Sequence, residues 1–463
     1  METGASSADA SLLAWLRARG LTGTKEGCAE GECGACAVAM LARDAQGRPR
    51  FEAVNSCLLP LAAVEGRSVV TVEGVAGAGG ALHPVQAALA RGGGSQCGYC
   101  TPGFVISLFC EYYREGRSAP DPEAISGNLC RCTGYRPILD VLRALPAVDP
   151  LDPVLSVLAE APLEAPVAPL DPGAAFVRPT RLDEVFQCLA RAPGAAVIAG
   201  GTDLMVTANA VGPAPTGSTR WVSLGAVPEL RRFEVSPDAI VIGASLPLSV
   251  LEERLREEAP GVVPLLEQLL PLFSSRLIKN RATLGGNLGT ASPIGDAHPV
   301  LLALDARVVV ASARGRRELP VSEFFLGYRK TALAPDELVT EVVLPRPLPA
   351  LQRFYKVSKR VLDDISTVSA AFSLDLTDAR RVGRLRVAYG GVAATPVRAV
   401  AAEDRAVGQP WTRATVEALL PLVERTGSPL SDLRGSAAYR RAMMGRLLEK
   451  FFHETAAAAQ APE

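Results

Sequence analysis

Four cysteines near the start of the chain constrain the fold most strongly. Cys28, Cys33 and Cys36 have the spacing C-x4-C-x2-C, and Cys57 follows on a separate segment. This is the ligand spacing of a plant-type [2Fe–2S] cluster. The loop is rich in glycine and alanine, so backbone N–H groups can approach the cluster sulfurs. A zinc site or a disulfide pair is the alternative. If the chain had only the C-x2-C spacing, a zinc site would be favoured. The full spacing favours iron–sulfur.

A second set of cysteines follows, with the spacing C-x2-C and then C-x-C. Its members are Cys97, Cys100, Cys130 and Cys132. Thr101 and Pro102 predict a helix N-terminus directly after Cys100. All four cysteines therefore lie on loops that lead into helices, where free N–H groups favour an anionic, thiolate-ligated cluster. This spacing is less diagnostic than the first, and by itself it leaves a zinc site open.

The composition is that of a globular protein in a reducing compartment. Of 463 residues, 48% are hydrophobic and 21% charged, and the net charge of −1 does not favour a polyanionic partner. The start METGASSADA has no features of a signal peptide, and no run is apolar enough for a membrane span. Ten cysteines in a chain of this length indicate metal or redox chemistry rather than a secreted disulfide framework. We therefore expect a cytoplasmic protein.

The hydrophobic pattern predicts small α+β units followed by a linker. Residues 9–20 predict a short helix capped by Asp9 or Ser11 and ended by Gly20. Strands are expected at 37–41, 51–54 and 68–73, and the pattern becomes helical from Leu82. Residues 145–175 are rich in proline and alanine without a clear period, which predicts a semi-extended linker.

Two glycine-rich turns follow the linker. The first, in GAAVIAGGTDL at 194–204, lies between an apolar strand and a helix-like start, and the second lies in ATLGGNLGTASPIGDAHP at 282–299. Such turns can offer N–H groups to a phosphate, although an ordinary β-turn is the alternative for each. Neither G-x-G-x-x-G nor a P-loop is present, so a Rossmann or Walker site is not supported. From about residue 350, alternating patterns predict strands, then helices and a disordered tail.

The cysteine motifs carry a family resemblance. In order, GTKEGCAEGECGAC, LHPVQ, SQCGYCTPGF and GNLCRCTGYRPIL resemble the iron–sulfur region of the xanthine dehydrogenase family of molybdenum hydroxylases. The resemblance implies one [2Fe–2S] cluster on Cys28, Cys33, Cys36 and Cys57, and a second on Cys97, Cys100, Cys130 and Cys132. It also places Gln96 beside the molybdenum cofactor of a partner domain, although an exposed loop glutamine is the plainer interpretation.

The later motifs resemble the family's flavin domain, through VIAGGTDL, TLGGN, SPIGD, FFLGYRKT and DDIS. Tyr328 would lie near the isoalloxazine ring and Asp363 near the flavin and nicotinamide pocket, although a solvated turn pair with Asp364 is the alternative for Asp363. The residues implied to contact FAD are Val197, Ile198, Ala199, Gly200, Gly201, Thr202, Asp203, Leu204, Phe273, Thr283, Leu284, Gly285, Gly286, Asn287, Asp296, Tyr328, Val339, Lys356 and Asp363.

The implied fold is a multidomain α+β chain. It has a ferredoxin-like β-grasp [2Fe–2S] domain, a four-helix [2Fe–2S] domain, a two-subdomain α+β FAD-binding domain and an α+β C-terminal flavoprotein domain. The expected boundaries are 1–80, 81–144, a linker at 145–175, 176–347, 350–455 and a tail at 456–463. Family members usually have a strand hairpin before the first helix. None is predicted in this sequence, so either the start of the chain is assigned too late or the sheet has lost its first hairpin, and the loss would expose a strand edge.

The resemblance also implies a function. The molybdopterin domain does not follow the flavin part, so the chain is expected to be the small subunit of a xanthine dehydrogenase (EC 1.17.1.4) in purine catabolism. A molybdopterin-binding large subunit would hydroxylate hypoxanthine and xanthine to urate, and this chain would pass the electrons through two clusters to FAD and NAD. No residue of this chain is expected to catalyse the hydroxylation itself.

The expected assembly is an α2β2 heterotetramer, without nucleic acid or membrane. One alternative is a related hydroxylase that acts on aldehydes, nicotinate or another heterocycle, because the substrate would be chosen by the partner subunit. The other alternative is a zinc-stabilised scaffold without enzymatic activity.

Overall fold

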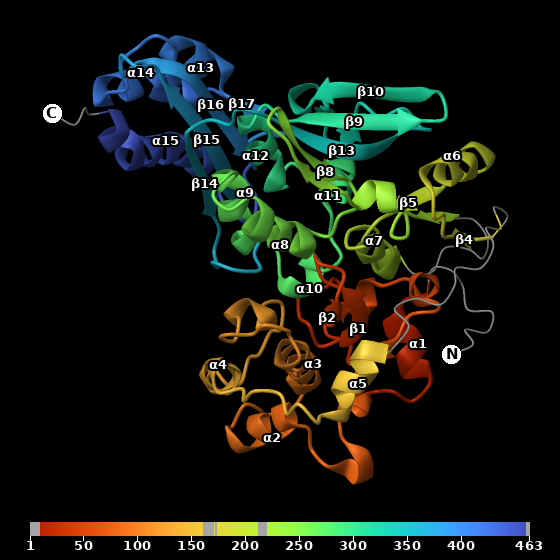
Figure 1. Cartoon of the computed structure of the whole chain (residues 1–463). Coiled ribbons are helices and arrows are strands. Elements are labelled where there is room, and N and C mark those ends of the chain that lie inside the picture. Colours follow the sequence, from red (N-terminus) through yellow and green to blue (C-terminus); the bar gives the residue numbers. More distant parts are fainter. Residues whose placement is uncertain (1–9, 161–170, 172–173, 212–219, 460–463) are drawn as a thin grey trace. The chain divides into compact units, whose positions relative to one another are not determined.

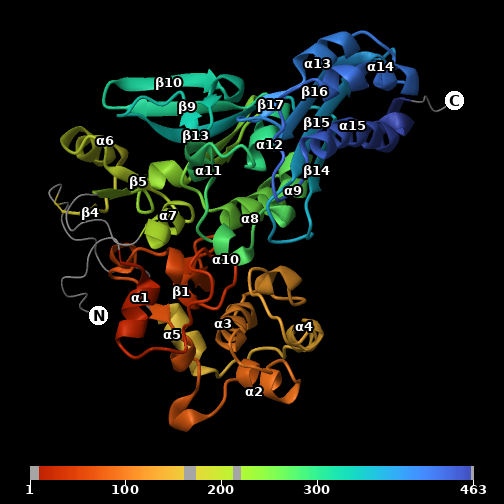
Figure 2. The same ribbon diagram turned by 180° about the vertical axis from the view of Figure 1, so that it is seen from behind.

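The computed structural model describes residues 10–160, 171, 174–211 and 220–459, which form two compact units. The first unit comprises 1–227, 247–250 and 274–282, and the second comprises 228–246, 251–273 and 283–463. Helices and sheets occur in both units (Figures 1 and 2). The predicted multidomain α+β class is confirmed.

The first cysteine set is carried by a small sheet and one helix. Strands β1 (Ala37–Arg43), β2 (Pro49–Asn55) and β3 (Val69–Val70) form an antiparallel sheet in the order β2-β1-β3. Helix α1 (Leu12–Ala18) begins after Ser11, whose side chain accepts a hydrogen bond from the Ala14 N–H, while the other predicted cap, Asp9, lies outside the described residues. The buried face of α1 packs on alternate residues of the strands, which gives this part its core.

The predicted absence of a hairpin before the first helix concerns the edges of this sheet. Among residues 10–36, which precede β1, the structure has α1 and no named strand, and residues 1–9 lie outside the described part. Strand β3 is an outer strand of the sheet, and Val69 and Val70 are only half-buried. The β2 edge is covered, because the Asn280 side chain donates a hydrogen bond of 2.8 Å to the Ala53 carbonyl.

The second cysteine set lies in a helical domain whose core is built around α3. Its elements are α2 (Pro84–Arg91), α3 (Thr101–Tyr112), the 3-10 turn η5 (Pro122–Ile125) and α4 (Arg136–Arg143). The predicted cap at Thr101 is one residue off. Cys100 is the N-cap of α3 and already has helical backbone angles, and the Thr101 hydroxyl instead lies 2.8 Å from the Ser95 hydroxyl.

The predicted linker is partly helical, which corrects the expectation of a semi-extended segment. Helix α5 (Pro153–Glu160) begins after Asp152, whose carboxylate accepts the Val154 N–H at 2.9 Å and the Tyr113 hydroxyl at 2.8 Å. Leu158 is buried in the core of the helical domain. The helix forms because tertiary contacts override a sequence without clear periodicity. Residues 161–170 lie outside the described part.

The first unit also contains a short parallel sheet and a helix from far along the chain. Strands β4 (Phe176–Val177), β6 (Trp221–Ser223) and β5 (Ala196–Ile198) are parallel in the order β4-β6-β5, with α6 (Leu182–Arg191) and α7 (Leu204–Val211) beside them. The distant helix is α10 (Arg276–Lys279).

Helix α10 is bound to the helical domain by buried charge. The Lys279 side chain is fully buried and pairs with Glu123. Arg276 pairs with the same carboxylate at 2.7 Å and with Asp121 at 3.3 Å. An unpaired charge at this depth would cost several kcal/mol, so these partners are needed wherever Lys279 is buried.

The second unit contains two larger sheets. The five-stranded sheet has the order β10-β9-β13-β8-β7, and the four-stranded sheet has the order β14-β15-β16-β17. The strands of the first are β7 (Phe233–Val235), β8 (Ala239–Gly243), β9 (Arg307–Ser312), β10 (Gly315–Pro320) and β13 (Leu338–Pro345). Those of the second are β14 (Leu351–Val357), β15 (Val368–Leu376), β16 (Val382–Gly390) and β17 (Val397–Arg398). A small hairpin joins β11 (Phe325–Gly327) and β12 (Lys330–Thr331).

The four-stranded sheet is covered on both faces. Phe372 and its even-numbered neighbours on β15 share a core with α13 (Val400–Ala406), α14 (Arg413–Glu424) and α15 (Ala437–Ala459), drawn in blue in Figure 1. On the other face, the Ser373 hydroxyl donates to the Ala303 carbonyl of α12 (Ala297–Ala303). The remaining helices are α8 (Leu248–Glu258), α9 (Pro264–Leu269) and α11 (Leu284–Thr290). Helix α15 extends to Ala459, so it includes the first residues of the expected tail.

Candidate iron–sulfur and flavin sites

The first cysteine set is half enclosed by the protein core. The structure brings its thiols together as two pairs, Cys28 with Cys33 and Cys36 with Cys57. The sulfurs of Cys36 and Cys57 are 3.3 Å apart and both residues are buried, whereas Cys28 and Cys33 are partly exposed. Two pairs of thiols suit two irons, with two protein sulfurs on each.

The loop between Cys28 and Cys33 aims backbone groups at sulfur. The N–H groups of Glu30 and Cys33 both donate to Cys28 Sγ at 3.4 Å. Ala29 has a φ of 57° and Gly31 a φ of 83°, so the loop makes a left-handed turn around the sulfur. Such N–H groups stabilise negative charge on a ligand sulfur and tune the potential of a bound cluster.

The thiols within each pair titrate differently. Hydrogen bonding to Cys33 lowers the pKa of the Cys28 thiol to about 5, although burial acts against it. Hydrogen bonding to Cys57 likewise lowers the pKa of Cys36, and the same bonds raise the pKa of Cys33 and of Cys57. Each pair therefore favours one thiolate, which is the form that binds metal.

The second set is similarly paired but more exposed. Cys97 lies beside Cys132 and Cys100 beside Cys130. Cys97 and Cys132 are exposed, and Cys130 is buried. Hydrogen bonding from the Tyr99 N–H and then from Cys132 lowers the pKa of Cys97, while burial raises the pKa of Cys100 to about 12. The exposed pair presents its sulfurs at the surface of the helical domain.

The two cysteine sets are joined by one backbone hydrogen bond. The N–H of Leu129, next to Cys130, donates to the carbonyl of Cys33 at 3.0 Å. The buried Asn128 side chain supports this contact, because it donates to the Gly34 carbonyl and accepts the Ser107 hydroxyl at 2.6 Å. The predicted ligand residues of the two sets are thus connected through a few bonds.

Close approach at this junction requires glycine. A β-carbon on Gly103 would collide with the Gly34 carbonyl, and one on Gly34 would collide with the Gly127 carbonyl. The second predicted ligand loop therefore lies directly against the first.

The first predicted FAD segment, Val197–Leu204, lies in the first unit as the end of β5 and the turn into α7. Ile198, Leu204 and Met205 share a hydrophobic core cluster with Cys36 and Cys57. Gly200 leaves no room for a β-carbon beside the Arg281 carbonyl. The segment thus packs against the buried half of the first cysteine set.

The other predicted FAD residues lie in the second unit, where three of them meet. Lys356 Nζ is 3.0 Å from an Asp296 carboxylate oxygen and donates to the Leu272 carbonyl at 3.0 Å, directly before Phe273. The Ser366 hydroxyl donates to the same carboxylate at 2.7 Å. These contacts bring Phe273, Asp296 and Lys356 close together.

The segment Thr283–Asn287 forms the start of helix α11 and is held by the Thr283 side chain and by a histidine. The Thr283 side chain accepts the Gly286 N–H at 3.0 Å, and the fully buried His298 ring lies 3.1 Å from the Asn287 carbonyl. Burial lowers the pKa of His298 to about 4, so the ring is neutral and donates through Nε2. His298 lies in the quoted stretch at 282–299, but sequence reasoning assigned it no role.

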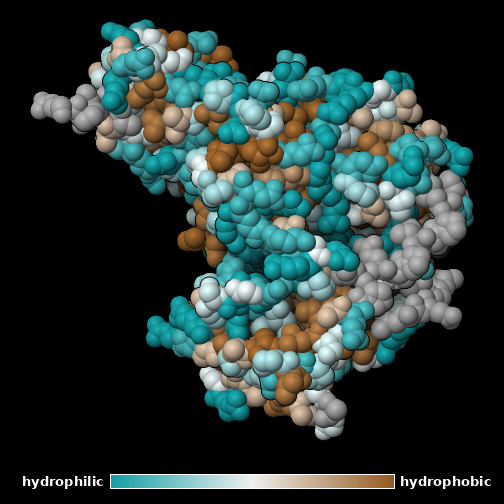
Figure 3. Space-filling view, in the orientation of Figure 1, coloured by the Kyte–Doolittle hydropathy of each residue, from teal (hydrophilic) through white to brown (hydrophobic). Residues whose placement is uncertain are grey.

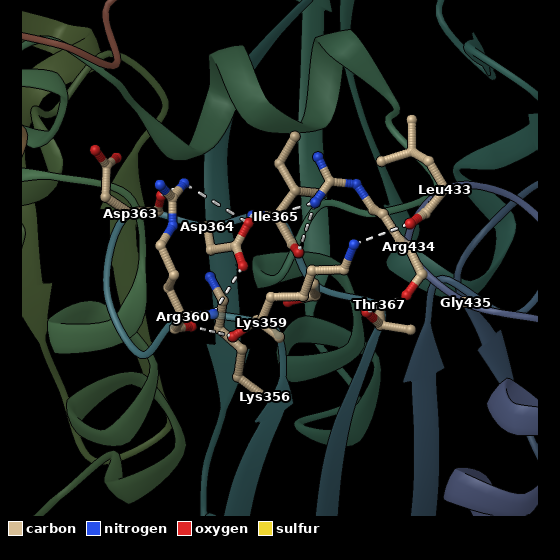
Figure 4. A network of polar contacts seen from close by, with 12 residues as sticks. Lys356, Lys359, Arg360, Asp363, Asp364, Ile365, Thr367, Leu433, Arg434 and Gly435 are labelled. Carbon is tan, nitrogen blue, oxygen red and sulfur yellow. Dashed lines mark hydrogen bonds and ion pairs between the residues drawn. The ribbon is translucent and has the colours of Figure 1, made fainter.

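The remaining predicted FAD residues differ in exposure. Tyr328 is exposed and Val339 is buried in β13. Asp363 has a φ of 50°, and its carbonyl accepts a hydrogen bond from Arg360. Figure 4 shows Asp363 at one end of a network of polar contacts. Its neighbour Asp364 accepts the Arg360 and Ile365 N–H groups and lies 3.4 Å from Arg434.

The described residues contain no group of three or more His, Cys, Asp or Glu side chains spaced for a metal ion. Within the same part of the chain, no helix combines the length and apolarity needed to cross a membrane. The face shown in Figure 3 mixes hydrophilic and hydrophobic residues.

Four family models match successive parts of the sequence. They are described as a 2Fe-2S iron-sulfur cluster binding domain (residues 2–62), a [2Fe-2S] binding domain (71–143), an FAD binding domain in molybdopterin dehydrogenase (172–347) and a CO dehydrogenase flavoprotein C-terminal domain (353–455). The chain is homologous to the N-terminal part of xanthine dehydrogenases and to the small subunits of molybdenum hydroxylases. It contains two [2Fe–2S] domains and an FAD-binding domain.

Curated relatives agree with this assignment. The chain is 31% identical to xanthine dehydrogenase 2 of Arabidopsis thaliana, over 95% of this chain and 38% of that protein. It is 33% identical to the xanthine dehydrogenase of Drosophila pseudoobscura pseudoobscura, over 96% of this chain and 38% of that protein. The chain thus spans little more than a third of the length of these relatives.

Solved structures share the fold of part of the chain. A carbon monoxide dehydrogenase from Hydrogenophaga pseudoflava is matched with 28% identity and a TM-score of 0.55, over 62% of this chain and 98% of that chain. Quinoline 2-oxidoreductase from Pseudomonas putida 86 is matched with 26% identity and a TM-score of 0.55, over 64% of this chain and all of that chain.

The cysteines present fit the implied clusters. Each cysteine set supplies four sulfurs in two pairs, and N–H groups point at Cys28 Sγ in the first set. This donor chemistry is that of a [2Fe–2S] cluster held by four thiolates. The individual ligands and FAD contacts remain predictions, and the supporting contacts of Asn128 and Lys279 were not anticipated from any motif.

Proposed function

We propose that this chain is the iron–sulfur and FAD subunit of a xanthine dehydrogenase. It would carry electrons from a molybdenum cofactor in a partner subunit, through two [2Fe–2S] clusters to FAD and on to NAD, during oxidation of hypoxanthine and xanthine to urate. Several curated proteins that match nearly the whole of this chain are xanthine dehydrogenases. We further propose a heterotetramer of two chains of each kind.

The observation that carries this proposal is the series of contacts in the first unit. The exposed pair Cys97 and Cys132 lies at one end, the Leu129–Cys33 hydrogen bond joins the two sets, and the buried pair Cys36 and Cys57 packs with the first predicted FAD segment. When bound, the clusters supply one-electron carriers and FAD a carrier that also exchanges electron pairs. The cysteines would hold the clusters in this order.

The exposed pair indicates where electrons would enter the proposed series of redox centres. An electron donor in a partner subunit must approach one set closely, and Cys97 and Cys132 offer the accessible sulfurs. Gln96, also exposed beside Cys97, would face the same partner. The FAD contacts proposed in the second unit centre on the Lys356–Asp296 pair, with Phe273, Tyr328, Val339 and Asp363 as further members.

Metal analysis and activity together test the proposal. The purified chain should contain about four irons and one FAD, whereas about two zincs without flavin would refute it. With its molybdopterin-binding partner, the chain should support oxidation of hypoxanthine with NAD as acceptor. Turnover of an aldehyde, nicotinate or quinoline without turnover of hypoxanthine would instead indicate a different hydroxylase of the family.

A further inference from the structure

Asn209 on α7 is bonded to both halves of the first cysteine set. Its side-chain nitrogen donates to the Ala29 carbonyl at 2.8 Å and to the Cys57 carbonyl at 3.0 Å. Ala29 follows Cys28 of one thiol pair, and Cys57 belongs to the other. One amide group therefore ties together two loops that are far from it in sequence.

The bond to Ala29 falls on a strained residue. Ala29 has a φ of 57°, in the left-handed region that is disfavoured for a residue with a β-carbon. This turn directs the Glu30 N–H at Cys28 Sγ, at 3.4 Å. A hydrogen bond to the Ala29 carbonyl opposes relaxation of the peptide that joins Ala29 to Glu30.

We propose that Asn209 is a positioning residue for the first cluster: it holds the Ala29 turn, and thereby the Glu30 N–H that faces the Cys28 sulfur. An N–H group directed at a ligand sulfur stabilises the reduced, more negative state of a cluster and raises its potential. Asn209 thus sets the potential of the first cluster through the loop, without contacting a sulfur.

The position of Asn209 also connects the cluster with the flavin segment. Helix α7 starts at Leu204, the last residue of the first predicted FAD segment, and the Asn209 amide lies on the same helix. The proposed electron-carrying function gives this contact its purpose, because the helix that follows the FAD segment also orients the cluster loop. The inference itself requires only that the first set binds a [2Fe–2S] cluster.

The test is a redox titration of the full chain, followed by electron paramagnetic resonance of each cluster. Asn209→Leu should shift the reduction equilibrium of the first cluster about tenfold toward the oxidised state, which is about 59 mV for one electron. The second cluster should keep its potential. Asn209→Gln retains the NH2 donor, so its first-cluster potential should lie closer to that of the unaltered chain. This variant also provides a measurement if Asn209→Leu loses the cluster.

Two further variants separate positioning from a general loss of stability. Gly adopts positive φ without strain, so in an Ala29→Gly background the turn no longer depends on Asn209 and the shift should fall by about half or more. Asn280→Leu removes a different amide bond to the same domain, 2.8 Å to the Ala53 carbonyl, and should leave the potential unchanged.

The outcomes are distinguishable. An unchanged first-cluster potential in Asn209→Leu, an undiminished shift in the Ala29→Gly background, or an equal shift in Asn280→Leu would each overturn the inference. A chain that binds zinc instead of iron would overturn the proposed function as well. A chain with both clusters but no effect of Asn209 would leave the proposed function standing.

Discussion

The two cysteine sets have similar pairing but differ in how far they are enclosed, because the first contains a buried pair and the second an exposed pair. Cys36 and Cys57 of the first set are each 2% exposed and share a core with apolar side chains, whereas Cys97 and Cys132 of the second set lie at the surface. Both sets lie on glycine-containing loops, so the loop alone does not decide the exposure. The difference arises from what covers them. The buried pair of the first set is enclosed by α7 and the β5 turn, whereas Cys100 and Cys130 of the second set pack in a core that α3 and α4 share with β1 and β2, and Cys97 and Cys132 lie outside that core.

The largest expected effect is loss of one cluster without the other. Cys130→Ser should remove the paramagnetic signal of the second cluster and reduce the iron content from about four to about two per chain, because each set binds its cluster separately. Cys36→Ser should do the reverse. Cys110→Ser, at a cysteine outside both sets, is the control and should retain both signals. Loss of neither signal in Cys130→Ser would reject that ligand assignment.

The rates at which a chelator removes iron should differ between the two clusters. With a strong chelator under oxidising conditions, the second cluster should be lost several-fold faster than the first, because two of its ligands are exposed. Visible absorption and electron paramagnetic resonance can follow each cluster separately. Faster loss of the first cluster would show that exposure of the ligand residues does not control access to iron.

Gly103→Ala should loosen the junction between the two sets. The added β-carbon would meet the Gly34 carbonyl, and overpacking of this kind costs roughly 1–3 kcal/mol. The free energy of unfolding, measured by denaturant titration, should fall by that amount. Gly289→Ala, in helix α11 with open space around the new methyl group, is the matched control. Equal destabilisation by both substitutions would argue against a specific collision at the junction.

The smallest expected effect is a pH dependence confined to the helical domain. Burial lowers the pKa of His83, so below about pH 6.5 the unfolded domain binds more protons than the folded one. Stability conferred by neutral His83 is therefore present above that pH and is lost as the pH falls through the folded-state pKa. Residues 10–80 contain no histidine.

Thermal loss of each cluster at about pH 7.5 and about pH 5.5 measures this effect. The second cluster should become less stable at the lower pH by more than the first. In His83→Gln the extra loss should disappear, because the titrating group is gone. An equal acid response of both clusters in the unaltered chain would assign it to groups other than His83.

Local sequence patterns predicted the strands around the first cysteine set, the strand before the first glycine-rich turn and strands from about residue 350, but not the five-stranded sheet between them. The spacing of Cys28, Cys33 and Cys36 reflects local loop geometry, which is why it was readable from sequence alone. The helix in the linker was missed, because α5 depends on the contact between Asp152 and Tyr113 and on burial of Leu158. The roles of Asn128 and Asn209 were missed for the same reason, since their partners lie far away in the chain.

The buried pairing of Lys279 with Glu123 has a consequence for synthesis of the chain. All eight predicted cluster ligands have been made once Cys132 is added, yet α10 and Asn280 come roughly 150 residues later. At about 5–20 residues per second, that delay is on the order of 10 s. During this interval the nascent iron–sulfur part lacks the Lys279 and Asn280 side chains that later pair with Glu123 and with the Ala53 carbonyl of β2.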